Sequence, residues 1–510
     1  MPSPRALPLD LLSPNIARWE VADRSLADLL AETTAEAHLG VLVGSGESVA
    51  GTEPLALLGL DVDELVDQYE PSDKPGKRTS LPLTRGSGAI RAAHLVGIAD
   101  GTSADLRAAG AELGRATRDK GHLVIAVPRD STAEGLAALV EGVVLGGWSS
   151  PAWTASGVVA RNRPVEQVTV VAEGQAEAQA VIDAAVVRTR AALLARCLGV
   201  TPSNVKNPAW MAAQARTLGR RNGLAVKVWT EKDLARDGFG GLVAVGGGSA
   251  TPPRLVQLSW EPPGAGKSTP HIVLVGKGIT FDTGGLDIKP AEGMLPMKTD
   301  MMGSASVLAV LAACRDAGIT VRVTGLLALA ENAVSGAAYR PSDVISQYGG
   351  TTVEIGNTDA EGRIVLADAL AYAARQLAPD RIVDIATLTG AARVALARAM
   401  APVYATDDAL RDELVEAGTT VGETVWPMPL TPAYRRALDS DVADIKQFSS
   451  AHGAGSIMAA LFLEEFVGDV PWAHLDIAGP GRSDVDAGIL SKGATGFGTR
   501  LLLRWLEGLR

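Results

Sequence analysis

Strand-like and helix-like runs alternate along most of the chain. Between residues 1 and 175, the short apolar runs VLVG, HLVGIAD and HLVIAVP predict β-strands, and the Ala- and Leu-rich run ADLRAAGAELGRATRDKG predicts a helix. After residue 199, the strand-like runs are GLVAV, RLVQLSW, HIVLVG, VRVTGLLAL and RIVDIATL. Helical runs such as SASVLAVLAACRDAG and RIVLADALAYAARQLA separate most of them. This alternation is typical of an α/β fold.

The order of these runs also predicts two domains. A chain of 510 residues exceeds the roughly 250 to 300 residues at which a single core stops growing. Residues 1–175 are expected to form a smaller α/β domain and residues 176–198 a linker helix. Prolines at 202 and 208 end that helix, so a larger domain is expected over 199–510.

Composition narrows the class of protein. With 47% hydrophobic and 21% charged residues, the chain is expected to be globular. Its apolar runs are too short to cross a bilayer and its first residues, MPSPRALPLDLL, do not resemble a signal peptide, so we expect a cytoplasmic protein. The two cysteines, Cys197 and Cys314, have no CxxC spacing, which argues against disulfides and thiolate metal sites. A net charge of −11 disfavours nucleic acid as a partner, although it does not exclude a local basic patch.

Two glycine-rich segments resemble nucleotide-binding loops without meeting their requirements. PPGAGKST at 262–269 has Glu261 where a phosphate loop needs its first glycine, and it leads into a strand. GGGSATPP at 246–253 is expected to be a tight turn between the strands GLVAV and RLVQL. We therefore expect both to be connections.

Charged residues gather at three places where a strand gives way to a helix. HIVLVG leads into KGITFDTGGLDIKP, KTDMMGSAS precedes a helix expected near residue 303, and NTDAEGR precedes the helix RIVLADALAYAARQ. In open α/β sheets, ligands bind at the carboxyl ends of the strands. Simpler interpretations exist, since Asp300 can be a helix cap and NTDAEGR a solvated turn. The charged residues are Lys277, Asp282, Asp287, Lys289, Asp300, Asp359, Glu361 and Arg363.

If the three junctions converge, their carboxylates need more positive charge than the nearby lysines and arginine supply. Divalent metal ions are the economical source, because carboxylate oxygens are their ligands. No histidine lies between His271 and His452, so the site should accept Mn²⁺ or Mg²⁺ as well as Zn²⁺. Two ions about 3.5 to 4 Å apart can share a hydroxide and polarise a carbonyl, which is the chemistry of hydrolysis.

Three segments resemble the signatures of the leucyl aminopeptidase family, two-metal exopeptidases also called cytosol aminopeptidases or peptidase A. They are VGKGITFDTGGLDIKP, MKTDMMGSAS and NTDAEGRIVLADAL. Weaker similarity extends from about residue 196 to the C-terminus, through ENAVSGAAYRPSD, DIATLTGA, SIMAALFLEEF and AHLDIAGP. EGVVLGGW resembles the end of the family's variable N-terminal domain. The resemblance implies a smaller variable N-terminal α/β domain and a larger catalytic domain with a mixed central sheet flanked by helices.

Carried over position by position, the resemblance implies a role for each charged residue. The tighter metal ion would be bound by Lys277, Asp282, Asp300 and Glu361, and the more exchangeable one by Asp282, Asp359 and Glu361. Lys277 can coordinate only as a neutral amine, so its pKa must be depressed, which a neighbouring divalent cation would produce. Lys289 would stabilise the oxyanion as a cation. Arg363 would hold a bicarbonate that acts as general base, and Asp300 would contact the α-amino group of the substrate.

The resemblance also implies a substrate pocket. Met297, Thr387 and Gly390 match positions that line the pocket for the first side chain, although Met297 also fits plain core packing. The implied substrates are short peptides with a free N-terminus, preferably with leucine or another large apolar residue first, cleaved in housekeeping peptide turnover. The implied assembly is a homohexamer of two stacked trimers.

Two positions depart from the family's usual residues, and two other functions stay open. Asp287 stands where many members have Ser, and Met302 where many have Gly. We expect Asp287 to hold Lys289 protonated or to pair with it. A DNA-binding or regulatory role on the same scaffold is one alternative, which the acidic net charge disfavours. A scaffold with an inactive site is the other, which the complete set of ligand positions disfavours.

Overall fold

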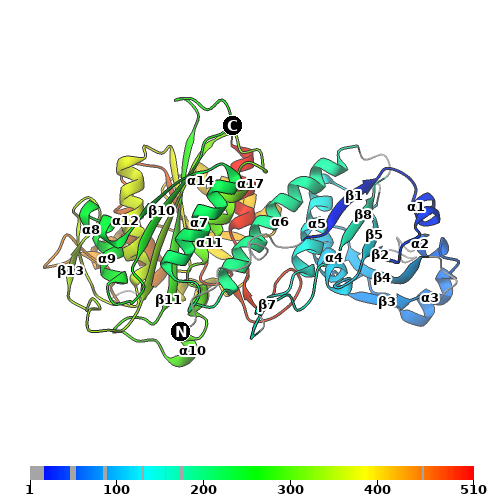
Figure 1. Cartoon of the computed structure of the whole chain (residues 1–510), viewed down its shortest axis with the longest axis horizontal. Helices are drawn as coiled ribbons and strands as arrows, with labels where there is room; N and C mark the ends of the chain where they lie inside the picture. Colours follow the sequence, from blue (N-terminus) through cyan, green and yellow to red (C-terminus); the bar gives the residue numbers. More distant parts are fainter. Residues whose placement is uncertain are drawn as a thin grey trace. The chain divides into compact units, whose positions relative to one another are not determined.

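The computed structural model describes residues 16–45, 53–83, 89–128, 131–155, 157–172, 176–450 and 453–509. They form two compact units (Figure 1). The smaller unit ends at residue 193 and also takes in 484–492, and the larger unit holds 194–483 and the residues from 493 on. The domain boundaries expected at 175 and 198 stay a prediction. Among the described residues, no helix is both long and apolar enough to cross a bilayer.

A six-stranded sheet forms the centre of the smaller unit. Neighbouring strands are parallel except for the edge strand β3. The order across the sheet is β1 (Arg18–Ala22), β8 (Gln167–Val171), β5 (His122–Ala126), β2 (Ala37–Gly44), β4 (Ile90–Ala99) and β3 (Arg78–Pro82). The unit also contains α1 (Leu26–Glu32), α2 (Glu53–Ala56), α3 (Val62–Tyr69), α4 (Ser103–Ala116), α5 (Ala133–Gly147) and the strand pair β6 (Ala152–Thr154) and β7 (Gly157–Val159). The expected α/β character of this region is confirmed.

Helices α4 and α5 pack with their backbones in direct contact, because glycines face each other where the helices meet. A Cβ added at Gly110 would lie 2.2 Å from the carbonyl oxygen of Leu139. One added at Gly142 would lie 2.3 Å from the carbonyl oxygen of Arg107. Both distances are too short for carbon against oxygen, so only glycine allows this approach.

We expect Gly142→Ala to lower the free energy of unfolding by about 1 to 3 kcal/mol, because the methyl group must push the two helices apart. Gly147→Ala, in the same helix, should have little effect, since the nearest atom to its Cβ would be 3.6 Å away. Urea unfolding followed by tryptophan fluorescence would compare the variants. Equal stability of the two would contradict the close packing of α4 and α5.

An eight-stranded mixed sheet forms the centre of the larger unit. Its order is β17 (Val425–Pro427), β16 (Ala401–Ala405), β19 (Trp472–Asp476), β15 (Arg381–Ala386), β11 (His271–Asp282), β12 (Arg322–Asn332), β10 (Arg254–Trp260) and β9 (Ala225–Trp229). The four central strands from β19 to β12 are parallel, and antiparallel pairs join them to β16 and β10. The predicted mixed sheet is therefore confirmed.

Helices and short strands complete the larger unit. The helices are the last part of α6 (Ala178–Val200), α7 (Pro208–Asn222), α8 (Glu231–Asp237), α9 (Gly240–Gly246), α10 (Ala291–Met294), η2 (Met297–Thr299), α11 (Met302–Ala313), α12 (Glu361–Gln376), α13 (Gly390–Leu396), α14 (Asp408–Val421), α15 (Pro432–Arg435), η3 (Arg436–Leu438), α16 (Gly455–Glu464) and α17 (Thr499–Gly508). The short strands are β13 (Val344–Ser346), β14 (Thr352–Glu354), β18 (Ile445–Lys446), β20 (Arg482–Ser483) and β21 (Gly493–Ala494).

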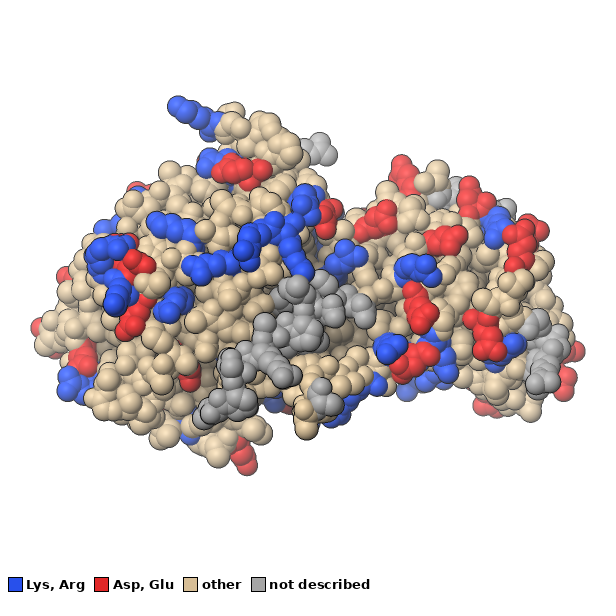
Figure 2. Space-filling view, in the orientation of Figure 1, with Lys and Arg blue, Asp and Glu red and all other residues tan. Residues whose placement is uncertain are grey.

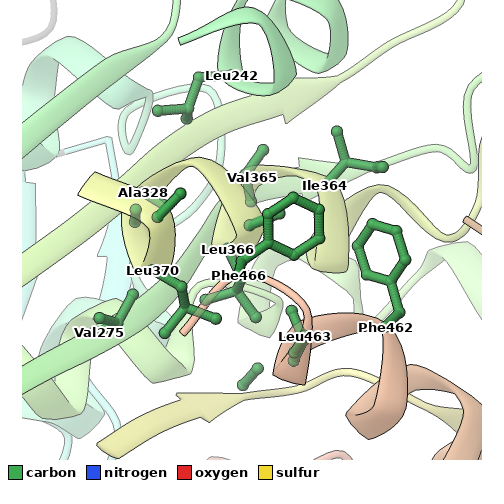
Figure 3. Close-up of a cluster of buried hydrophobic side chains, with 14 of the residues drawn as sticks. Leu242, Val275, Ala328, Ile364, Val365, Leu366, Leu370, Phe462, Leu463 and Phe466 are labelled. Carbon is green, nitrogen blue, oxygen red and sulfur yellow. The ribbon is translucent and has the colours of Figure 1, made fainter. Parts of the chain in front are cut away.

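Buried apolar side chains hold α12 in place. Figure 3 shows Ile364 of α12 beside Phe462 of α16, with Phe466 close by. Ile364 and Phe462 are both fully buried, and Val275 of β11 belongs to the same cluster. Burying each such side chain contributes roughly 1.5 to 3 kcal/mol. Because α12 begins at Glu361, this packing also fixes one of the predicted site residues.

One predicted strand is wrong. GLVAV lies inside helix α9, because a short apolar run does not distinguish a strand from a buried helix. The carboxylate of Asp368 accepts a hydrogen bond of 2.8 Å from the backbone N–H of Leu242 in this helix. GGGSATPP then connects α9 to β10, and PPGAGKST connects β10 to β11 without an intervening helix. The second connection therefore lacks the structure of a phosphate loop.

Charge is unevenly spread over the surface. Figure 2 shows Lys and Arg side chains gathered in a band over the area where α7 lies in Figure 1. Helix α7 exposes Arg216, Arg220 and Arg221. The net charge of −11 therefore does not describe this face. The expectation that nucleic acid is not a partner stays a prediction.

Candidate metal centre

The end of strand β11 brings Lys277 and Asp282 to the same site. The two residues are five positions apart, and in a regular strand they would point to opposite faces of the sheet. However, Ile279 pairs with Ala330 whereas Asp282 pairs with Asn332, so β11 contains one extra residue between these pairs. A bulge of this kind reverses the alternation. Both side chains are buried, with exposed fractions of 3% for Lys277 and 2% for Asp282.

Lys277 joins two of the predicted carboxylates. Its Nζ lies 2.8 Å from Oδ2 of Asp300 and 2.9 Å from Oε1 of Glu361. Asp300 is not the N-cap of α11, since that position is Met301. A Cβ at Gly362 would lie 2.6 Å from Cε of Lys277, so the glycine after Glu361 leaves space for the lysine. The helix-cap interpretation of Asp300 is therefore not supported.

Lys289 joins the other pair of carboxylates. Its Nζ lies 2.8 Å from Oδ2 of Asp282 and also pairs with Oδ1 of Asp359. Asp282, Asp359 and Glu361 each offer an oxygen, and the three oxygens lie within 4.8 Å of one another. The three strand-to-helix junctions thus converge, as the sequence predicts. The solvated-turn interpretation of NTDAEGR does not fit, because Glu361 is 1% exposed.

Burial and neighbouring charges move the pKa values of Lys277, Lys289 and Glu361 away from their ordinary values. Burial alone would lower the pKa of Lys277, but the carboxylates of Asp300 and Glu361 outweigh it and raise that pKa above the ordinary value. The pKa of Lys289 is likewise raised, against burial, by Asp282 and Glu361. Burial raises the pKa of Glu361, and the charge of Asp282 raises it further. The Glu361 carboxylate therefore favours a bound cation or a proton.

Three carboxylate oxygens in the cluster accept no hydrogen bond from any described residue, although each lies within ion-pair distance of a lysine. They are Oδ2 of Asp300, Oδ1 of Asp359 and Oε1 of Glu361. Buried carboxylate oxygens are normally satisfied by donors or by metal ions. This donor set consists almost entirely of oxygen and fits divalent cations.

Arg363 lies beside this cluster and is 5% exposed. Its Nη1 donates a hydrogen bond of 2.9 Å to the carbonyl oxygen of Gln447, but its Nε has no partner among the described residues. Burial lowers the pKa of Arg363 to about 10, against the opposing charge of Glu361. A buried guanidinium with an unused N–H can bind an anion.

The predicted pocket residues lie on two neighbouring segments. The Thr387 hydroxyl donates to Oδ1 of Asp300 at 2.7 Å, and its carbonyl oxygen accepts from Lys277 at 2.8 Å. Gly390 begins α13, and a Cβ there would meet no atom of the described residues within 4 Å. Met297 begins η2, three residues before Asp300. Only Thr387 of these three makes a described polar contact with the charged cluster.

The structure shows what the two residues that depart from the family's usual pattern, Met302 and Asp287, contact. Met302 is fully buried, and a Cβ at Gly199 would lie 2.4 Å from its sulfur atom, so Met302 is a packing residue. Of the two expected effects of Asp287 on Lys289, the direct pairing is wrong. Lys289 pairs with Asp282 and Asp359, while Oδ2 of Asp287 accepts a hydrogen bond of 2.7 Å from the backbone N–H of Thr358.

Asp476, at the end of β19, supports the segment that carries Thr387. Its fully buried carboxylate accepts hydrogen bonds from the backbone N–H groups of Leu388, Thr389 and Ala478 and from the Thr389 hydroxyl. Sequence reasoning missed this residue. Its signal was an Asp within AHLDIAGP, a segment that the sequence analysis used only for its resemblance to the family.

We expect Asp476→Asn to lower the free energy of unfolding by about 1 to 3 kcal/mol, because an amide NH₂ would face buried N–H donors. Asp444→Asn is the matched control. Asp444 also accepts from the backbone N–H and hydroxyl of a threonine, Thr352, but in an exposed position where water can replace a lost partner. Urea unfolding would measure both changes, and equal effects would contradict the supporting role of Asp476.

Several known proteins are similar to most of this chain. The family description "Cytosol aminopeptidase family, catalytic domain" matches residues 193–503. A probable cytosol aminopeptidase of Streptomyces avermitilis is 43% identical over 452 residues, covering 86% of this chain and 87% of that protein. One of Roseiflexus castenholzii is 40% identical over 485 residues, covering 92% and 99%. The solved structure of the bottromycin maturation enzyme BotP in complex with Mn is 35% identical, with a TM-score of 0.80 over 94% of this chain and 100% of that one.

The strand-to-helix junctions, the buried carboxylate cluster and these similarities lead to one conclusion. The chain belongs to the cytosol aminopeptidase family, whose members are metal-dependent enzymes that hydrolyse the N-terminal residue of peptides.

Proposed function

We propose that the larger unit is a leucyl aminopeptidase that uses two divalent metal ions. The observation that carries this proposal is the set of buried carboxylate oxygens without hydrogen-bond donors at Asp300, Asp359 and Glu361. These oxygens come from two separate strand-to-helix junctions and point to more cationic charge than the two lysines provide.

The two ligand sets share Asp282 and Glu361. Lys277 and Asp300 complete the tighter set, and Asp359 completes the more exchangeable one. The distances of Lys277 from Asp300 and Glu361, 2.8 and 2.9 Å, support the first set, and the 4.8 Å spread of the other three oxygens supports the second. Lys277 has to release a proton before its nitrogen can bind a metal ion, since an ammonium group has no free electron pair.

Mn²⁺ or Zn²⁺ fits this site, and Mg²⁺ is a further possible occupant. A donor set of carboxylates and one amine does not select strongly among these ions, and the similar BotP is described in complex with Mn. When bound, such ions would activate a water molecule and polarise the scissile carbonyl.

The protein's own groups orient the peptide and stabilise charge. The Lys289 ammonium, with its raised pKa, remains cationic and stabilises the oxyanion that forms at the reacting carbonyl. The Asp300 carboxylate accepts a hydrogen bond from the free α-amino group of the peptide, which restricts cleavage to the first residue. Met297, Thr387 and Gly390 border the pocket for the first side chain. Among the described residues, no atom lies within 4 Å of a Cβ built at Gly390, which supports room for a large apolar residue such as leucine.

Arg363 holds an anion close to Glu361, and we assign bicarbonate to it as a general base. The unused Nε of the buried guanidinium supports an anion here. The further proposals rest on the family alone. They are a cytoplasmic homohexamer acting on short peptides in housekeeping turnover. The domain boundaries at 175 and 198 rest instead on the order of strand-like and helical runs along the sequence.

Metal-stripped protein should not release p-nitroaniline from leucine p-nitroanilide, and Mn²⁺, Zn²⁺ or Mg²⁺ added separately should restore the release. N-acetylation of the substrate should abolish it, because the α-amino group is then blocked.

Glu361→Ala should lower kcat by about 100-fold or more and reduce the bound metal, since it removes a ligand of both ions. Glu292→Ala removes an exposed carboxylate from nearby α10 and should have the kcat and the metal content of the unchanged protein. The proposal would be refuted if the unmodified substrate gave no metal-dependent release of p-nitroaniline.

Bicarbonate should raise kcat of the Mn²⁺-loaded protein in buffer freed of carbon dioxide. Arg363→Ala should have a lower kcat, by about 10- to 100-fold, and should no longer respond to bicarbonate. Arg340→Ala, an exposed arginine, should keep the response. A bicarbonate response that persists in Arg363→Ala would place the anion elsewhere.

A further inference from the structure

Thr358, the residue before the predicted ligand Asp359, is fully buried and has all of its polar groups bonded. Its N–H donates to Oδ2 of Asp287 at 2.7 Å, and its hydroxyl accepts from the N–H of Asp287 at 2.9 Å. The hydroxyl also donates to the carbonyl oxygen of Gly284 at 2.7 Å. This reciprocal pairing ties the backbone at 284–287 to the backbone at 358.

A second set of bonds holds Thr358 from another segment. Its carbonyl oxygen accepts from the Tyr339 hydroxyl at 2.8 Å and from Nδ2 of Asn332 at 3.0 Å. Tyr339 is buried, with an exposed fraction of 7%. Nδ2 of Asn332 also donates to Oδ1 of Asp282 at 2.9 Å. One residue thus connects three segments, and one of its partners contacts a ligand common to both proposed metal sets.

The glycines at 284 and 285 allow this close contact. Both have positive φ, +89° and +67°, which favours glycine. A Cβ at Gly284 would lie 2.9 Å from Oδ1 of Asp359, and one at Gly285 would lie 2.9 Å from the hydroxyl oxygen of Thr358. The loop therefore lies directly against Thr358 and Asp359, so movement of one segment displaces the other.

We propose that Asp287 and Tyr339 are positioning residues that fix Asp359 as a ligand of the more exchangeable metal ion. This inference rests on the proposed function. Neither side chain pairs with Lys289, so their effect is on the backbone before Asp359. Asp287 is itself exposed, but the N–H that it accepts belongs to a fully buried residue. Metal ligands depend on such supporting hydrogen bonds for their orientation.

The test is the binding of Mn²⁺ to the full chain, measured by isothermal titration calorimetry. The unchanged protein should bind two ions. Asp287→Ala and Tyr339→Phe should each raise the Kd of the more weakly bound ion by about 10- to 100-fold. The Kd of the tighter ion should change little. Asp287→Asn should restore binding to within about threefold, because an amide oxygen can still accept from Thr358.

Two controls match these substitutions. Glu292→Gln removes an exposed carboxylate from nearby α10. Tyr372→Phe removes a hydroxyl that bonds only Gln257 in the described structure, at 3.1 Å. Both should bind Mn²⁺ like the unchanged protein. Circular dichroism in EDTA would show whether each variant is folded. If Asp287→Ala does not fold, Tyr339→Phe still tests the positioning role.

The outcomes separate this inference from the proposed function. If the unchanged protein binds fewer than two Mn²⁺ ions, both fail. If it binds two and neither Asp287→Ala nor Tyr339→Phe weakens the second ion, the positioning role alone is overturned. If Asp287→Asn binds the second ion as weakly as Asp287→Ala does, the loss of affinity comes from the lost charge, and the positioning role of Asp287 is overturned as well.

Discussion

The larger unit depends on one constraint, the burial of several carboxylates next to one another. Asp282, Asp300 and Glu361 have exposed fractions of 2%, 6% and 1%, so water cannot screen their repulsion. Charges in such a position require cations nearby or take up protons. Lys277 contacts Asp300 and Glu361, and Lys289 contacts Asp282 and the neighbouring Asp359. Under the proposed function, bound metal ions would supply the remaining compensation.

Backbone geometry makes that crowding possible. The extra residue in β11 turns Lys277 and Asp282 toward one site, and glycine at 362 leaves space for the lysine between its partners. Helix α12 holds Glu361 in place through an apolar face that packs against α16. The electrostatic cost of the cluster is therefore offset by hydrophobic burial elsewhere in the same elements.

Sequence reasoning located the charged cluster but not the residues that support it. The α/β pattern predicted most strands, and three charged junctions predicted the cluster, because the carboxyl ends of parallel strands meet at one edge of a sheet. GLVAV failed because apolar composition does not separate a strand from a buried helix. Asp476 was missed and Asp287 was misassigned for another reason. Their partners are backbone N–H groups, about 88 and 71 positions away respectively, which no side-chain pattern reveals.

The hydrogen bonds around each carboxylate distinguish a ligand from a support. Asp476 is buried near the cluster, but N–H and O–H donors occupy both of its oxygens, so a metal ion would have to displace them. Asp300, Asp359 and Glu361 each keep one oxygen free of such donors. A carboxylate saturated by backbone amides fixes a loop, whereas one that lacks donors is available to a cation. Whether a carboxylate in this site supports a loop or is available to a cation therefore depends on where the backbone N–H groups point, as well as on where the acidic residues lie.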